Sequence, residues 1–352
     1  MILEQTLRSI KPLNEQAMQA AQKHWDALAK PLHGLGDLED VLTKIAGITG
    51  TPNIDLSKKC VIVMCADNGV VEEGISQTGQ EVTAVITENL SRGTSTVCHM
   101  AHAAHADVIP VDIGVARDVQ GEHILSRKIA YGTKNLYREP AMTREQAIRA
   151  IEVGIETAKH CKEQGYRIAA TGEMGIGNTT TTAAVTSVLL GADAEQVTGR
   201  GAGLSSDGLK KKLQVVKGAI QKHEPNAQDP VDVLSKVGGF DICGLTGLFL
   251  GGALYGLPMI IDGVISCAAA LCAVRLCPTV QEYLIPSHHT AELAGVLLEQ
   301  ELQLHPLIDA HMALGEATGA VCLFGMLDMT ASLYIHGNTF DDSKIEAYIP
   351  LT

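Results

Sequence analysis

The sequence predicts an α/β protein: a doubly wound, mostly parallel, Rossmann-like sheet with helices on both faces, and a smaller helical domain built from both ends of the chain. Two observations favour this class. Short apolar segments rich in β-branched residues alternate with helical segments through the middle of the chain, which is typical of βαβ units. Polar or glycine-rich residues follow nearly every predicted strand, where folds of this kind bind ligands.

The predicted strands are short, apolar and followed by polar or glycine residues. They are Lys59–Ala66, Ala106–Ile113, Tyr166–Ala170 and Pro258–Ile261. The segments between them are predicted to be helices that cover the sheet. These helices are Glu81–Ala104, Thr143–Gln164, Asn178–Leu190, Asp207–Lys222, Asp241–Gly256 and Gly263–Val274.

One apolar run has an alternative interpretation. Ile242–Ile261 carries no charged residue over 20 positions, which is the length of a transmembrane helix. However, the run contains five glycines, and Pro258 lies near its end. We therefore interpret it as a buried helix followed by a buried strand, and we expect no membrane partner.

The two ends of the chain lack strand-like segments. Leu3–Leu28 and His311–Ile335 are both predicted to be helical. We therefore expect a large nucleotide-binding α/β domain over residues 30–300, and a small helical domain made of residues 1–29 and 301–352.

Composition limits the function classes. Of the 352 residues, 46% are hydrophobic and 19% are charged, which excludes a disordered chain. The net charge of −13 argues against nucleic acid as the main partner. The nine cysteines include no C-x-x-C pair and are expected to be buried thiols. Because Met1–Ile10 has no apolar signal segment, we expect a cytoplasmic location.

The densest motif is Thr171–Thr182, which follows a strand and opens a helix. Gly175 and Gly177 let backbone N–H groups approach an anion, and the following Asn/Thr run places that anion at a helix N-terminus. The motif is not a Walker A loop, and Thr180 stands where a dinucleotide fingerprint has its third glycine. The structural alternative is a glycine-rich turn before a strongly capped helix, although four threonines are poor helix formers.

A second glycine-rich loop, Thr198–Leu204, precedes another predicted helix. Lys210, Lys211 and Lys212 follow early in that helix, where cations oppose the helix dipole. One of them is therefore a candidate to face a phosphate. The alternative for Lys210 and Lys211 is a solvated basic surface.

Glu316 is a lone carboxylate among small and apolar residues. Desolvation there would raise its pKa and suit a general base, whereas a paired or exposed glutamate is the alternative. The histidines carry less information. His99, His102 and His105 lack the partners of a metal site and are interpreted as structural, and a helix is expected to start at Thr290.

Taken together, these motifs resemble the nicotinate-nucleotide–dimethylbenzimidazole phosphoribosyltransferase family. The resemblance covers about residues 30–330, in order. The matching segments are Gly172–Thr180, Gly199–Gly203 with Lys212, Gly238–Ile242, Ile261–Gly263, Leu314–Ala317 and, nearer the start, Pro31, Leu35-Gly36, Leu38-Glu39, Asp67, Gly69-Val70 and Val82-Thr83.

The resemblance implies a reaction. Nicotinate mononucleotide transfers its ribose phosphate to an aromatic base, nicotinate leaves, and an α-linked nucleotide of the cobamide lower ligand forms. It implies no metal and no cofactor, and a dimer with shared sites.

The resemblance also implies the roles of individual residues. Glu316 is the general base and Glu173 the second catalytic residue. The residues implied to bind the nucleotide and its phosphate are Met174, Gly175, Gly177, Asn178, Thr179, Thr180, Gly201, Gly203, Lys212, Asp262, Gly263 and Thr290. The residues implied to bind the acceptor are Thr78, Ile86, Leu314 and Gly315.

Three departures from the family pattern bear on the acceptor and on assembly. Asn68 stands where the family has a histidine, His33–Gly36 differs from Gly-Ser-Leu-Gly, and Ile75–Gln80 lacks a proline. One alternative is a phenol- or cresol-activating paralogue that works as one subunit of a heterodimer, with Ile86 as an apolar wall of its acceptor pocket. Ordinary benzimidazole chemistry, a partner subunit with little activity alone, and an unrelated α/β enzyme such as a dehydrogenase also stay open.

Overall fold

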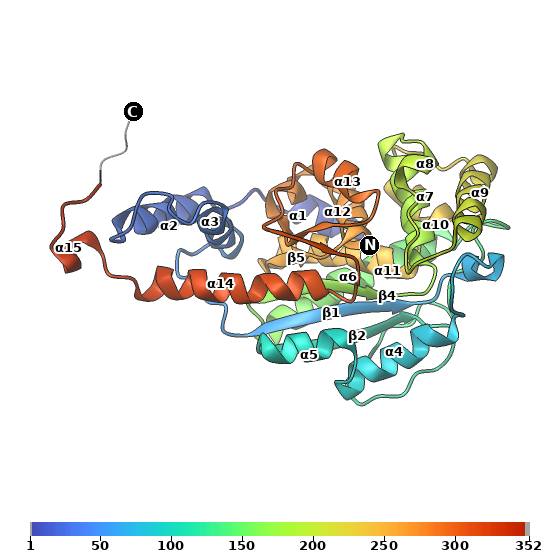
Figure 1. The fold of residues 1–352 in the computed structure, drawn as a ribbon, viewed down its shortest axis with the longest axis horizontal. Helices are drawn as coiled ribbons and strands as arrows, with labels where there is room; N and C mark the ends of the chain where they lie inside the picture. Colours follow the sequence, from blue (N-terminus) through green and yellow to red (C-terminus); the bar gives the residue numbers. More distant parts are fainter. Residues whose placement is uncertain (1, 349–352) are drawn as a thin grey trace.

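The computed structural model describes residues 2–348 and contains a six-stranded sheet in which every pair of neighbours is parallel (Figure 1). The strand order is β3-β2-β1-β4-β5-β6. The chain adds strands toward one edge of the sheet from β1 to β3 and toward the other edge from β4 to β6, so the predicted doubly wound α/β class is confirmed. The strands are β1 (Lys59–Ala66), β2 (Ala106–Gly114), β3 (Leu125–Ser126), β4 (Ile168–Met174), β5 (Met259–Ile261) and β6 (Ile285–Pro286).

Alternate residues of β1 enter two separate hydrophobic clusters, one on each face of the sheet. Ile62 and Met64 join the cluster under α6, α11 and α12, whereas Val61 and Val63 join the one under α4, α5 and α14. The helices named here are α4 (Glu81–Arg92), α5 (Thr96–Ala103), α6 (Arg144–Glu163), α11 (Phe240–Tyr255), α12 (Val264–Leu276) and α14 (Thr318–His336). This burial on both faces explains why the strands are almost purely apolar.

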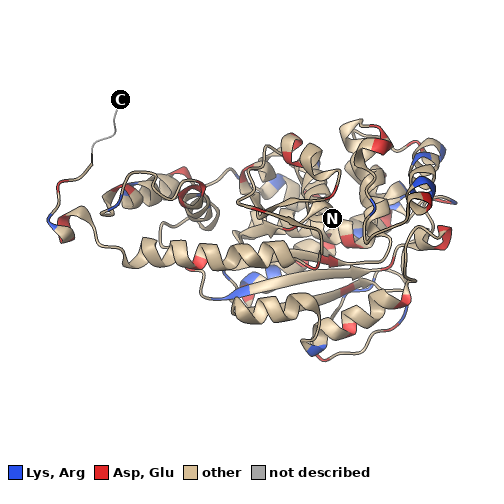
Figure 2. Cartoon of the chain, viewed as in Figure 1, with Lys and Arg blue, Asp and Glu red and all other residues tan. Residues whose placement is uncertain are grey.

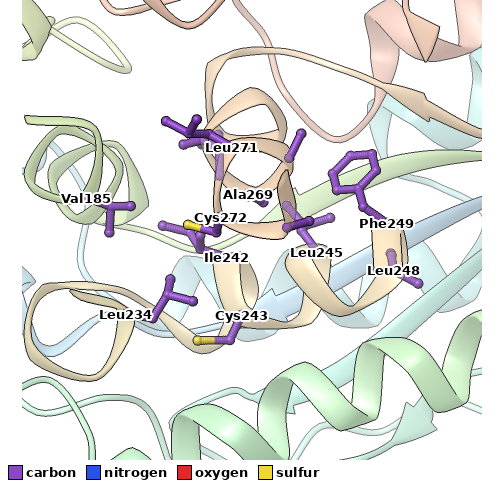
Figure 3. Packing of buried hydrophobic residues seen from close by; sticks show 14 of the residues in the cluster. Val185, Leu234, Ile242, Cys243, Leu245, Leu248, Phe249, Ala269, Leu271 and Cys272 are labelled. Atoms are coloured by element: carbon purple, nitrogen blue, oxygen red, sulfur yellow. The ribbon is translucent and has the colours of Figure 1, made fainter. Parts of the chain in front are cut away.

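Glycines allow α6 and α11 to pack closely on the first face. A Cβ added to Gly247 would lie 1.9 Å from the carbonyl oxygen of Ile151, and one added to Gly154 would lie 2.0 Å from that of Gly244. Figure 3 shows the adjoining core, where aliphatic side chains of α11 meet those of α12. A core with few aromatic residues therefore gains its density from close backbone contact.

The remaining helices surround these layers. Figure 1 places α7, α8 and α9 at one end of the sheet and α2, α3 and α15 at the other. They are α1 (Ile2–Ser9), α2 (Glu15–Ala27), α3 (Asp37–Thr49), α7 (Asn178–Leu190), α8 (Ala194–Val197), α9 (Ser206–His223), α10 (Pro230–Val237), α13 (Gly295–Glu301), α15 (Phe340–Ser343) and the 3-10 turns η1 (Gly69–Glu73) and η2 (Pro278–Tyr283).

Two predicted helices are each interrupted. The predicted helix Glu81–Ala104 is α4 followed by α5, because Gly93 takes a left-handed conformation with φ +73° and ends α4. The predicted helix Leu3–Leu28 is α1 followed by α2. The chain between them contains Pro12, and the side chain of Asn14 caps α2 by accepting a hydrogen bond from the Ala17 N–H.

Two predicted helix starts are wrong. Residues expected to open helices at Thr290 and His311 instead lie in a small parallel sheet of β7 (His288–Thr290) and β8 (Ile308–Met312). The helix α13 begins only at Gly295, and α14 only at Thr318.

The uncharged run Ile242–Ile261 is divided between α11 and β5, both in the core. Among the described residues, α14 is the helix that is long and apolar enough to cross a membrane, but 56% of that stretch is buried inside the protein and it packs on α3, α5 and β4. Cys322 is half-buried and the other eight cysteines are buried, as expected of free thiols.

The helices near the two ends of the chain do not all lie together. Helix α3 packs on α2 and α14, whereas α1 packs on α6 and α11 on the face of the sheet. The domain boundaries at residues 30 and 300 remain a prediction, and α3 lies with the terminal helices although it falls within the predicted large domain.

Candidate active site

A cavity of about 190 Å³ lies where β4 and β5 end, beside β7, β8 and the residues before α14. This is the carboxyl edge of the sheet, where the sequence predicts the site. Twelve of the predicted site residues line it: Glu173, Met174, Gly175, Asn178, Thr179, Gly201, Asp262, Gly263, Thr290, Leu314, Gly315 and Glu316.

A second cavity of about 160 Å³ lies on the other side of the loop that opens α7. Gly175, Asn178 and Thr179 line both cavities, whereas Gly177 and Thr78 line the second and not the first. Of the residues implied to bind the acceptor, Thr78 is therefore separated from Leu314 and Gly315.

Four predicted site residues line neither cavity. Ile86 is half-buried and packs on the core of the α4, α5 and α14 face, and Thr180 is buried within α7. Gly203 accepts a hydrogen bond from the Gln77 side chain, which joins the two loops above the second cavity. Lys212, the fourth, lies behind the first cavity.

Lys212 is the buried member of the lysine run on α9. Figure 2 shows Lys and Arg positions grouped along this helix, and Lys210 and Lys211 are exposed as the solvated-surface interpretation expects. The Lys212 side chain is 1% exposed, and its Nζ donates to Thr179 Oγ1 at 2.8 Å and to the Gly199 carbonyl at 3.1 Å. Burial lowers the pKa of Lys212 to about 8. Lys212 thus places a positive charge directly behind the cavity wall.

Gly175 and Gly177 have packing roles in the loop. A Cβ added to Gly175 would lie 2.5 Å from the Ala66 carbonyl oxygen and 2.6 Å from Asp241 Oδ2, so only glycine lets the loop rest on the end of β1. Gly177 has φ +91° and precedes the first residue of α7. The loop therefore needs both glycines before any ligand is bound.

Glu173 is a half-buried carboxyl group in the wall of the cavity. Its Oε2 accepts a hydrogen bond from the Asn178 side-chain amide. Burial raises the pKa of Glu173 well above its ordinary value, and the charges of Asp241, Asp262 and Glu316 raise it further. The sequence predicts a desolvated carboxyl at Glu316, and the structure places Glu173 and Glu316 together in the wall of one cavity, both half-buried.

Glu316 lines the same cavity and is also half-buried. Its Oε2 accepts a hydrogen bond of 3.3 Å from the Val97 N–H, in the first turn of α5. Gly315, Glu316 and Ala317 are three consecutive left-handed residues, with φ of +91°, +57° and +73°. The backbone therefore reverses just before α14 and directs Glu316 to the cavity.

Sequence analysis missed several residues of this site. Asp262 was predicted to bind the nucleotide. In the structure its Oδ1 also accepts a hydrogen bond of 3.0 Å from the Ala320 N–H and so caps α14. Burial raises the pKa of Asp262, and the charge of His288 opposes this. His288 and Glu292 also line the cavity, and Asp241 lies beneath it. None of the three is among the predicted site residues, although Asp241 falls in the matching segment Gly238–Ile242, because β7, α11 and α14 meet only in the folded chain.

Asn68 does not reach either cavity. Its side chain is fully buried against Gly175 and Gly239, and neither polar atom of its amide has a hydrogen-bond partner. In residues 2–348, no three His, Cys, Asp or Glu side chains are grouped so that they could hold a metal ion.

Comparisons with known proteins agree with this geometry. A family model described as phosphoribosyltransferase matches residues 10–345. The nicotinate-nucleotide–dimethylbenzimidazole phosphoribosyltransferase of Ruminiclostridium cellulolyticum is 46% identical over 351 residues, covering 100% of both chains. That of Acetivibrio thermocellus is 47% identical over 349 residues, covering 99% of both. The crystal structure of CobT from Thermus thermophilus has a TM-score of 0.89 at 37% identity and covers 95% of this chain and 100% of its own. The chain therefore belongs to the nicotinate-nucleotide–dimethylbenzimidazole phosphoribosyltransferase family.

Proposed function

We propose that this chain transfers ribose phosphate from nicotinate mononucleotide to dimethylbenzimidazole, releasing nicotinate and forming an α-linked nucleotide. The names of its relatives support the substrates. The observation that carries the proposal is the meeting of two different carboxyl groups, Glu173 and Glu316, with the Lys212-backed loop around one cavity.

The loop at the start of α7 is the proposed phosphate site. Lys212 donates to Thr179 Oγ1, so the Thr179 hydroxyl hydrogen is free to point at an anion in the cavity. The N-terminus of α7 and the Lys212 charge both favour a phosphate there. The same loop lines both cavities, and the ribose is proposed to lie between the phosphate and Glu316.

Glu316 is the proposed general base. As the acceptor nitrogen bonds to C1′ of the ribose, the bond from C1′ to the nicotinate nitrogen breaks and its electron pair stays on nicotinate. The acceptor N–H proton then passes to Glu316. The Val97 N–H holds the receiving carboxylate in place, and Leu314 and Gly315 lie beside it for the acceptor ring.

The acceptor is proposed to be dimethylbenzimidazole rather than a phenol. Neither Asn68 nor Ile86 lines a cavity, so the departure at Asn68 and the apolar wall at Ile86 that favoured a phenolic pocket are not expected to touch the acceptor. The dimer implied by the family, proposed here to be a homodimer, and the cytoplasmic location expected from the sequence remain part of this proposal. Sedimentation of the purified chain at several concentrations tests the homodimer, and a monomer would contradict it.

The test of the function is an assay of the purified chain with nicotinate mononucleotide. Chromatography should show equal amounts of nicotinate and α-linked nucleotide with dimethylbenzimidazole, and neither product without an acceptor. Adenine, phenol and para-cresol are the comparison acceptors. Absence of nicotinate release with every acceptor would overturn the proposal, and product only with a phenol would overturn the acceptor.

A further inference from the structure

Asp241, in the first turn of α11, lies directly beneath the cavity floor without lining it. The side chain is fully buried, and its Oδ2 would be 2.6 Å from a Cβ on Gly175. Its Oδ1 accepts the Ile242 N–H at 3.0 Å, but Oδ2 has no hydrogen-bond partner. A buried carboxylate that is only half satisfied keeps a strong field around it.

Asp241 and Glu173 are linked through Asn178. The Asn178 amide donates to Glu173 Oε2 and also faces Asp241. The Asn68 amide faces Asp241 as well, since Asn68 Nδ2 and Asp241 Oδ2 would lie 3.1 Å and 2.6 Å from the same Cβ on Gly175. These amides only partly offset the burial of Asp241, whose pKa is raised to about 6. At neutral pH Asp241 therefore holds its negative charge beneath Glu173.

His288 lines the same cavity as Glu173, but the groups whose charges raise the pKa of Glu173 are all acidic. They are Asp241 from α11, Asp262 after β5 and Glu316 before α14. The substrate adds the charges of its phosphate and of its nicotinate carboxylate. An ionised Glu173 would oppose each of these, whereas a protonated one donates a hydrogen bond.

We propose that Asp241 is a positioning residue that keeps Glu173 in its neutral form, so that Glu173 meets the nucleotide as a hydrogen-bond donor while Glu316 acts as the base. Two carboxyl groups in one cavity then have opposite duties, set by what lies behind each of them. The inference rests on the proposed function for its kinetic part. Its structural part concerns the protonation of Glu173 in the free protein.

The kinetic consequence is a loss at alkaline pH. The kcat/KM for nicotinate mononucleotide should fall as pH rises and Glu173 loses its proton. Asp241→Asn keeps the shape and removes the charge, so Glu173 should ionise earlier and the fall should move to lower pH by about one unit or more. Glu173→Gln is permanently neutral and keeps a donor, so it should remove this fall and retain nucleotide binding better than Glu173→Ala.

The experiment measures pH profiles for wild type, Asp241→Asn, Glu173→Gln, Glu173→Ala and the double variant Asp241→Asn/Glu173→Gln. Asp26→Asn is the matched control, because it removes a charge from an exposed residue on α2 and should leave the profile unchanged. In the double variant, Asp241→Asn should no longer shift the profile.

Infrared spectra of the free protein separate this inference from the function. A protonated carboxyl band should be present in wild type at neutral pH, be absent in Glu173→Gln, and titrate at lower pH in Asp241→Asn. Absence of the band in wild type, an unshifted profile in folded Asp241→Asn, or equal losses in Glu173→Gln and Glu173→Ala would overturn the inference. If Asp241→Asn does not fold, the infrared band of the wild type and the comparison of Glu173→Gln with Glu173→Ala still test whether Glu173 is protonated.

Discussion

The lysine run on α9 shows what can be predicted at the scale of the residue. The position of Lys212 after a glycine-rich loop indicates a phosphate role, but its burial follows from the packing of α9 on α7, which no spacing reveals. The same limit applies to the comparison of Glu316 with Glu173. The neighbours of Glu316 in sequence are apolar, whereas the acidic neighbours that matter in space surround Glu173.

Removing the Lys212 charge should weaken nucleotide binding selectively. Lys212→Met retains the buried volume and removes the donor to Thr179, and a charged hydrogen bond contributes about 1.5–3 kcal/mol. We expect the KM for nicotinate mononucleotide to rise about 10- to 150-fold while the KM for the acceptor changes little. Lys210→Met, on the exposed side of α9, is the control. Equal increases in both KM values would contradict the assignment.

The pKa of Lys212 predicts a pH dependence of its own. Because its pKa is lowered to about 8, Lys212 loses its charge as pH rises through about 8 in the free enzyme. The kcat/KM for the nucleotide should fall over that range. Lys212→Arg stays charged and should remove this part of the fall. A profile that is identical in Lys212→Arg and wild type would argue against Lys212 as its source.

Glu316→Gln tests the base. The substitution keeps the shape, and loss of a general base typically lowers the rate by about 10²–10⁴-fold. We expect the kcat to fall in this range with little change in the KM for the nucleotide. Glu122→Gln, at an exposed loop position, is the control. Near-normal turnover of Glu316→Gln with dimethylbenzimidazole would exclude Glu316 as the base.

At the scale of the element, whether a segment is a helix or a strand was easier to predict than where a helix is interrupted. Lys59–Ala66 and Asn178–Leu190 match their predicted bounds, because their patterns are long and uniform. Gly93 interrupts a predicted helix, since the helical periodicity runs on through a residue whose φ is positive only in the folded chain. The short strands β7 and β8 were missed because their pairing joins residues far apart in sequence.

Substitution by alanine should change the free energy of unfolding in opposite directions at a crowded glycine and at an open one. Gly175→Ala places a Cβ 2.5 Å from a backbone oxygen, and overpacking of this kind costs about 1–3 kcal/mol. Gly325→Ala, in α14 with open space around it, should instead add about 0.5–1 kcal/mol to the free energy of unfolding. Urea denaturation of both variants measures this. A Gly175→Ala protein as stable as wild type would contradict the packing role of the loop.

At the scale of the whole molecule, the alternation of strands and helices predicts the class but not the strand order. The order, and the place of α3 beside α2 and α14, depend on which apolar faces meet. Helix α14 contacts both this helical group and β4. The terminal helices are therefore tied to the sheet and are not expected to unfold independently.

The single tryptophan can test this coupling. Trp25 is fully buried in α2, and its ring packs edge-on against Tyr334 of α14 at 4.8 Å. In a urea titration, tryptophan fluorescence and far-ultraviolet circular dichroism should give coincident transitions. A fluorescence change at clearly lower urea would show that the helical group unfolds first, and would contradict the expectation.

The left-handed turn before α14 has a consequence for engineering. A left-handed alanine costs roughly 1–2 kcal/mol, whereas burying its methyl group recovers about 0.8 kcal/mol, and the Ala317 side chain is fully buried. Ala317→Gly is therefore close to neutral for the fold, and a thermostability screen would accept it. The same change widens the backbone freedom of the residue next to Glu316. Selection for thermal stability would therefore accept glycine at position 317, whereas selection for catalytic rate would retain alanine.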